Sequence, residues 1–275
     1  FWFETESINP MTIMAQTPNT LQHSQEAEAA HLKSLELAQA SHGKRDMQQV
    51  LHFMRIAAEG GHAGAQCNLG FLYAVGDGVE ADSSQAIHWF SSAAELGDIQ
   101  ACYNLSQLYL GGHGVPADES LALQLLRKAA NLGHPDALYN LGIYSYSGAP
   151  SVEQDYKAAF VFFENAASVG HSDALFSVGL CYSKGHGVEL DSIQAVAYYK
   201  RAADKGHANA IFNLGLYYYY GEGGLHKDIG MAETLFLRAS ELGHDRAGAA
   251  AESAKKERIQ QEQSKLVEAF ADVAL

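Results

Sequence analysis

The sequence predicts an all-α solenoid, which is a stack of antiparallel helix hairpins, and two observations carry this prediction. Alanine recurs at intervals of 36 or 37 residues, a period typical of repeat proteins. Each interval also holds two helical stripes of apolar residues separated by glycine-rich turns. A unit this small cannot bury its own apolar face, so neighbouring units must stack. The repeat alanines are Ala65, Ala101, Ala137, Ala174, Ala210 and Ala247.

The interval from residue 174 to 209 shows how each element of a unit is justified. Apolar residues at helical spacing over 174–182 predict a first helix. The glycines of Gly185–Val188 interrupt it, because a tight connection needs their conformational freedom. Asp191 follows and can cap a second helix, since its carboxylate accepts otherwise unpaired backbone N–H groups. Gly206 ends that helix in a position typical of a left-handed C-cap.

These motifs resemble the SEL-1-like repeat family, a relative of the tetratricopeptide repeats. The run Ala65–Tyr73, the loop Gly76–Val79 and the segment Ala86–Gly97 carry the family pattern, and the resemblance extends over about residues 46 to 250. The resemblance implies a right-handed α-solenoid of about five hairpins, capped at both ends. It also implies a non-enzymatic scaffold or adaptor that binds partner proteins.

The repeat positions divide the chain into segments. A degenerate N-terminal capping repeat is expected over residues 24–64, with helices at about 24–41 and 46–60. A C-terminal capping helix is expected over 247–275, because the glycine-rich loop is missing there. Two loops, 148–152 and 221–225, are one residue longer than the others and are expected to protrude. The five repeats are 65–100, 101–136, 137–173, 174–209 and 210–246.

Residues 1–23 fit no unit and are expected to form an extended arm. Its aromatic residues Phe1, Trp2 and Phe3 are candidate anchors for a partner protein, because buried aromatic side chains carry much of the binding energy at interfaces. The competing interpretation is a floppy tail, since chain termini are often poorly ordered.

Composition narrows the range of partners. A net charge of −14 disfavours nucleic acid and anionic membranes as main partners. No run of 18 apolar residues is present, so a soluble chain is expected, with membrane contact only through partners. The three cysteines occupy different repeat positions, which indicates neither a disulfide framework nor a metal site. A reducing compartment, such as the cytoplasm or an organelle matrix or stroma, is favoured.

Histidine is abundant, but its placement argues against chemistry. Five of the 13 histidines occupy one repeat position, directly after the glycine that ends the second helix, which favours a structural role at the turn. No metal-binding motif, phosphate-binding loop or nucleophile–base arrangement is recognisable, so we expect no metal, no cofactor and no enzymatic activity. The five histidines are His62, His134, His171, His207 and His244.

The remaining candidate is a groove, which in tetratricopeptide arrays is lined by the first helix of each hairpin. The position three residues after the repeat alanine is polar, and a side-chain amide can both donate to and accept from a peptide backbone. Nearby aromatic residues complete the predicted groove, although each could instead pack between hairpins. The polar set is Asn68, Asn104, Asn140 and Asn213. The aromatic set is Tyr103, Tyr139, Phe176, Phe212, Tyr146 and Tyr219.

The sequence therefore predicts an interaction scaffold that serves as an accessory subunit of a larger multiprotein assembly, with partner segments held by the groove and the arm. The alternative is a regulator of an enzyme, or a ligand-binding module with a small-molecule or peptide site in the groove.

Overall fold

The structure is a computed structural model that describes residues 18–39, 46–149 and 151–273. Across these ranges the chain forms 13 α-helices in sequence and no β-strand. Helices alternate between the first (A) and second (B) member of a hairpin, as the repeat pattern predicts. The chain divides into two compact units, residues 1–128 and 129–275, which are described separately.

The first unit begins earlier than predicted. Helix α1 spans Pro18–Ala38, so the final residues of the expected arm are helical, because proline is well tolerated in the first turn of a helix. The unit continues with α2 (Met47–Glu59), α3 (Ala63–Val75), α4 (Ser83–Glu95) and α5 (Ile99–Gly111). Val50, Leu51, Met54 and Leu69 are buried in a core that α1, α2 and α3 share. Helix α6 (Glu119–Asn131) runs across the boundary between the units.

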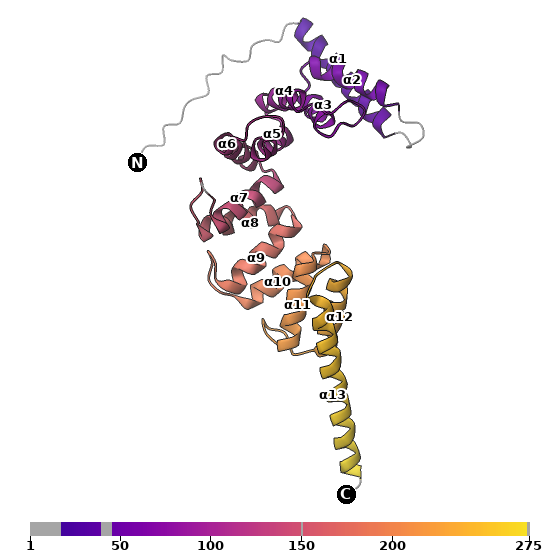
Figure 1. Ribbon diagram of the computed structural model, residues 1–275, viewed down its shortest axis with the longest axis vertical. Helices are drawn as coiled ribbons and strands as arrows, with labels where there is room; N and C mark the ends of the chain where they lie inside the picture. Colours follow the sequence, from indigo (N-terminus) through magenta and orange to yellow (C-terminus); the bar gives the residue numbers. More distant parts are fainter. Residues whose placement is uncertain (1–17, 40–45, 150, 274–275) are drawn as a thin grey trace. The chain divides into compact units, whose positions relative to one another are not determined.

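The second unit contains three hairpins and a long final helix (Figure 1). The hairpins pair α7 (Pro135–Ser147) with α8 (Tyr156–Ser168), α9 (Ser172–Lys184) with α10 (Ser192–Asp204), and α11 (Ala208–Tyr220) with α12 (Ile229–Glu241). Helix α13 (Ala247–Val273) packs on α12, and its C-terminal part extends beyond the hairpin (Figure 1).

Capping explains much of the sequence period. An aspartate accepts a backbone N–H at the start of each B helix, and Asp191, which was predicted to do so, accepts from Ile193 and Gln194. At the start of the A helices histidine has the same role, because its Nδ1 atom accepts the N–H of the repeat alanine. Asp98 replaces histidine in the second repeat. The side chains of the repeat alanines are themselves fully buried. The repeated alanine therefore marks a position whose N–H is capped and whose side chain is packed in the core.

A close approach within each hairpin explains the small residue that comes directly after the leucine position of the A helix. A Cβ atom built on Gly142 would lie 2.5 Å from the ring of Phe163, and one on Gly215 would lie 2.6 Å from the ring of Phe236. Gly179 and Tyr199 have the same relationship. The glycine of the A helix thus makes room for an aromatic ring of the B helix. Phe163, Phe236 and Tyr199 are accordingly 1% exposed.

The lengthened loop at 221–225 does not protrude as predicted. Gly223 has a φ of +63°, and a Cβ atom there would lie 2.8 Å from the carbonyl oxygen of Ser192 and 2.6 Å from Cγ2 of Val196. The loop therefore packs back onto α10, as the shorter loop at Gly187 packs onto α8, because glycine alone allows this conformation and this approach. The other long loop includes residue 150, which lies outside the described residues.

Candidate functional site

The A helices of the second unit present a continuous stripe of side chains on one face. Residues two, six and nine positions after the repeat alanine share this face, because they are separated by about one and two helical turns. We call this set the groove stripe. In α7 it consists of Tyr139, Ile143 and Tyr146; in α9 of Phe176, Leu180 and Ser183; and in α11 of Phe212, Leu216 and Tyr219.

A cleft of about 300 Å³ opens on the groove stripe between α7 and α9. Helix α8 contributes Phe163, and the start of α11 contributes the polar residues His207 and Asn209. The walls are mostly apolar and aromatic, with a few polar groups directed inward, which is the usual composition of a ligand site. The complete lining is Tyr139, Ile143, Tyr146, Phe163, Asp173, Phe176, Ser177, Leu180, His207 and Asn209.

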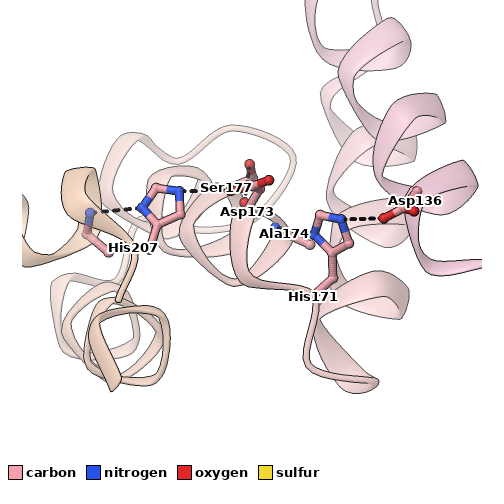
Figure 2. Close-up of polar contacts among 7 residues, drawn as sticks. Asp136, His171, Asp173, Ala174, Ser177 and His207 are labelled. Atoms are coloured by element: carbon pink, nitrogen blue, oxygen red, sulfur yellow. Dashed lines mark hydrogen bonds and ion pairs between the residues drawn. The ribbon is translucent and has the colours of Figure 1, made fainter. Parts of the chain in front are cut away.

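Histidine and aspartate tie successive A helices together beside this cleft (Figure 2). His171 accepts the N–H of Ala174 at Nδ1, while its Nε2 atom lies 3.0 Å from Oδ1 of Asp136 on α7. One repeat later, Nε2 of His207 lies 3.2 Å from Oδ1 of Asp173. We call these two pairs the His–Asp ladder. Each histidine ring also stacks on an aromatic ring of the preceding repeat, as His171 does on Tyr139 with centroids 4.8 Å apart.

The cap on α11 and the contact with Asp173 favour one protonation state of His207. Nδ1 of His207 accepts the N–H of Ala210, so the ring proton is assigned to Nε2, which faces Asp173. A second proton on Nδ1 would oppose that backbone donor. Burial lowers the pKa of His207, and the nearby Asp173 carboxylate opposes this shift only in part. The neutral imidazole therefore leaves the negative charge of Asp173 uncompensated.

Two tyrosines of the groove stripe are positioned by neighbours rather than free to rotate. Burial raises the pKa of Tyr139, whose hydroxyl also makes a hydrogen bond with Ser177. The hydroxyl of Tyr146 lies 2.8 Å from Nδ1 of His186, in the loop that follows α9. Fixed aromatic side chains suit a binding surface, because little side-chain entropy is lost when a ligand docks.

The structure separates the predicted asparagines. Asn213 makes a hydrogen bond with Tyr199 of α10, so it takes part in packing within the solenoid. Asn104 accepts from Gln100 on its own helix, over 2.9 Å. Asn68 and Asn140 are half-buried, and none of the four predicted asparagines lines the cleft. The expected column of amides is therefore not gathered in the cleft between α7 and α9.

The predicted aromatic residues also divide. Tyr139, Tyr146 and Phe176 line the cleft. Phe212 is 6% exposed and stacks on His244 with centroids 4.1 Å apart, so it is a buried member of the groove stripe and contributes to packing between repeats rather than to an exposed groove. The hydroxyl of Tyr219 donates to Glu257 of α13, beside a smaller cleft of about 180 Å³.

The remaining sequence predictions lie elsewhere. Tyr103 belongs to the first unit, where it is half-buried on α5. The arm residues Phe1, Trp2 and Phe3 fall outside the described residues. Sequence reasoning missed Ile143, Leu180 and the polar pair Asp173 and His207. The position six residues after the repeat alanine was the available signal, since it is apolar in four repeats and yet faces outward: Ile143 is 38% exposed.

The thiols are poorly suited to reaction. Burial raises the pKa of Cys67 to about 12 and that of Cys181 to about 11. Burial also raises the pKa of Cys102. Within the described ranges, no three histidine, cysteine or acidic side chains are grouped so that they could hold a metal ion. No helix described by the structure has the combination of length and hydropathy needed to cross a bilayer.

Stacked two-helix repeats of this kind define a helical-repeat protein, or α-solenoid. Within that class the chain belongs to the Sel1 repeat family, whose sequence profile matches residues 63–98, 99–134, 135–171, 172–207 and 208–244. Sel1 repeat proteins are in general scaffolds for protein–protein interaction and are typically non-catalytic. No curated protein sequence matches the chain significantly.

Solved structures agree with this membership. A Sel1 repeat protein from Oxalobacter formigenes shares 31% identity, covering 79% of this chain and 84% of that chain with a TM-score of 0.70. A protective antigen present in uropathogenic Escherichia coli strains, which displays an SLR fold, shares 30% identity over 83% of this chain with a TM-score of 0.75. The present chain spans 50% of the length of that antigen.

Proposed function

We propose that this chain is a non-enzymatic scaffold that holds a segment of a partner protein in the cleft between α7 and α9, as an accessory subunit of a larger assembly. The observation that carries the proposal is the groove stripe itself. Ile143 is 38% exposed beside the aromatic rings of Tyr139 and Phe176, and all three side chains line the same cleft. Exposed apolar surface bordered by polar groups is typical of interaction sites.

The size of the cleft supports a peptide segment as the occupant. A volume of about 300 Å³ accommodates only one or two side chains. The groove stripe continues from the cleft along α11, to Leu216 and Tyr219, so further contacts along the same segment are available. An extended segment could insert a few anchor side chains into this surface. This would be typical of protein interfaces, where a few residues carry most of the binding energy.

Site-specific photo-cross-linking tests this function. A photo-reactive phenylalanine derivative replaces Ile143 in the cleft or, as a control, Val161 on α8, which is 53% exposed. In extract of the organism that makes the protein, the probe at position 143 should form a discrete adduct with a partner polypeptide, and Leu180→Glu should abolish it. Identical adducts from both positions, or none from position 143, would argue against the proposal.

The alternative is a regulator or binding module that takes a small molecule in the same cleft. The cleft volume of about 300 Å³ supports this alternative, because it equals the lower end of the range for small-molecule pockets. Native gel filtration of the extract separates the two ideas. A subunit of an assembly elutes far above the 29.7 kDa of the chain, whereas a small-molecule module has no need to.

A further inference from the structure

The cleft carries an uncompensated negative charge. Among the described residues that line it, Asp173 is the only carboxylate, and none is lysine or arginine. Its side chain is 55% exposed even though one oxygen faces His207. Because that histidine is held neutral by the Ala210 cap, it fixes the position of the carboxylate without bringing a positive charge to it. A carboxylate held in a fixed position at the edge of an apolar cleft favours a cationic group on the ligand.

The aromatic ring beside this carboxylate is ready to accept the same group. Phe176 is stacked on one side by His207, with centroids 4.6 Å apart. Its remaining surface lines the cleft together with the ring of Tyr139. A cation over an aromatic face is stabilised by the ring quadrupole, and arginine makes this contact more often than lysine.

In the next repeat of the same chain, a guanidinium already lies over the equivalent aromatic ring. There the equivalent ring, Phe212, stacks on His244, and the guanidinium of Arg246 lies over it, 5.6 Å from the centroid. Arg246 directly precedes the repeat alanine Ala247. The corresponding residue over Phe176 is Asn209, which brings no positive charge. The chain therefore covers the ring of Phe212 with its own guanidinium, whereas the ring of Phe176 lines the cleft and has no guanidinium of the chain at the equivalent position.

We propose that the cleft binds an arginine side chain of the partner segment, with the guanidinium beside the Asp173 carboxylate and against the ring of Phe176. This inference rests on the proposed function and specifies the chemistry of its anchor. Arginine fits better than lysine because its planar guanidinium can stack on the ring and pair with the carboxylate at once. Apolar neighbours of the arginine would occupy the groove stripe at Ile143 and Leu180.

Fluorescein-labelled peptides that differ in one residue test the proposal. An arginine flanked by leucine and serine on each side is compared with the same peptide carrying citrulline, which has the same shape but no charge. By fluorescence anisotropy, the arginine peptide should bind about tenfold more tightly, as expected for a cation–π contact and an ion pair acting together. Asp173→Asn should reduce this preference to about twofold or less. The amide oxygen can still accept from His207, so the variant should keep its fold.

Asp136→Asn is the matched control, because Asp136 holds the same ladder position one repeat earlier and does not line the cleft. It should leave the preference for arginine intact. Equal binding of arginine and citrulline peptides, no binding of the arginine peptide, or equal losses in both variants would overturn the proposal. The photo-cross-link at position 143 does not depend on charge. If it persists while the peptide preference is absent, the binding function stands and only the arginine anchor fails.

Discussion

His207 and Asp173 join two functions of the solenoid in one contact. The imidazole caps α11 through Nδ1 and reaches back 3.2 Å from Nε2 to the carboxylate on α9. The contact thus joins the A helices of two successive repeats. It also positions Asp173, the one carboxylate among the residues that line the cleft. Stability and ligand preference are therefore linked through the protonation state of a single ring.

The first prediction is that acid weakens the second unit through His207. Its pKa is lowered in the folded protein, chiefly by burial, and lies near 6.5 in the unfolded chain. Between about pH 6.5 and the lowered folded pKa, the unfolded state binds more protons. The free energy of unfolding should therefore fall as the pH decreases through this window, and His207 should cause no further loss below it. Urea denaturation between about pH 7.5 and about pH 5.5 measures the effect.

His207→Asn is the control for this pH dependence, because asparagine can cap a helix but does not titrate. The variant should lose part of the slope of stability against pH. Burial also lowers the pKa of His134, so some slope should remain. Equal slopes in the wild type and the variant would contradict the assignment of a neutral ring.

The second prediction concerns the fit between Gly142 and Phe163. Gly142→Ser should destabilise the second unit by about 1–3 kcal/mol, because the added Cβ atom would lie 2.5 Å from the ring. The second repeat has Ser106 and Leu126 at the equivalent positions, both fully buried. Adding Phe163→Leu should therefore recover part of the loss. Thermal unfolding of the single and double variants forms a complete cycle, and strictly additive losses would refute the paired fit.

Most of the fold could be predicted from the sequence because the repeat multiplies weak local signals. A single aspartate before an apolar run is weak evidence for a helix cap, but an aspartate at the same position of every repeat is strong evidence for one. The predicted start of the first helix was wrong because the first hairpin lacks the repeat signals, and Pro18 is as compatible with an arm as with a first helical turn. The prediction for the loop at 221–225 was wrong because an extra residue does not reveal whether a glycine packs against a neighbouring helix.

The candidate site was predicted only in part, for a physical reason. Phe176 and Phe212 occupy the same repeat position, and periodicity cannot separate them. The difference lies in the next repeat along the chain, since Arg246 covers Phe212 whereas Asn209 stands at the corresponding place near Phe176. Likewise, Asn213 bonds to Tyr199, a partner that no pattern along the helix could name. Contacts between repeats, rather than positions within them, decide what is exposed.

The third prediction is that the three cysteines are unreactive in the folded protein. The pKa values of Cys67 and Cys181, raised to about 12 and about 11, leave almost no thiolate near neutral pH. Reaction with a chromogenic disulfide reagent should therefore be negligible in buffer and should reach three thiols per chain in concentrated urea. A thiol that reacts in buffer as fast as free cysteine would contradict this burial.

The fourth prediction is that Gly223 fastens the lengthened loop at 221–225 to α10. Gly223→Ala combines a φ of +63° with a Cβ atom 2.8 Å from the carbonyl oxygen of Ser192. The left-handed conformation alone costs about 1–2 kcal/mol, and the backbone contact should add to it. Gly243→Ala isolates the first effect, because its φ is +86° and an added Cβ atom meets nothing within 4 Å. Urea denaturation should show the larger loss for Gly223→Ala. Equal losses would mean that the loop moves away from α10 at no cost, and that the close approach of Gly223 to Ser192 adds nothing to stability.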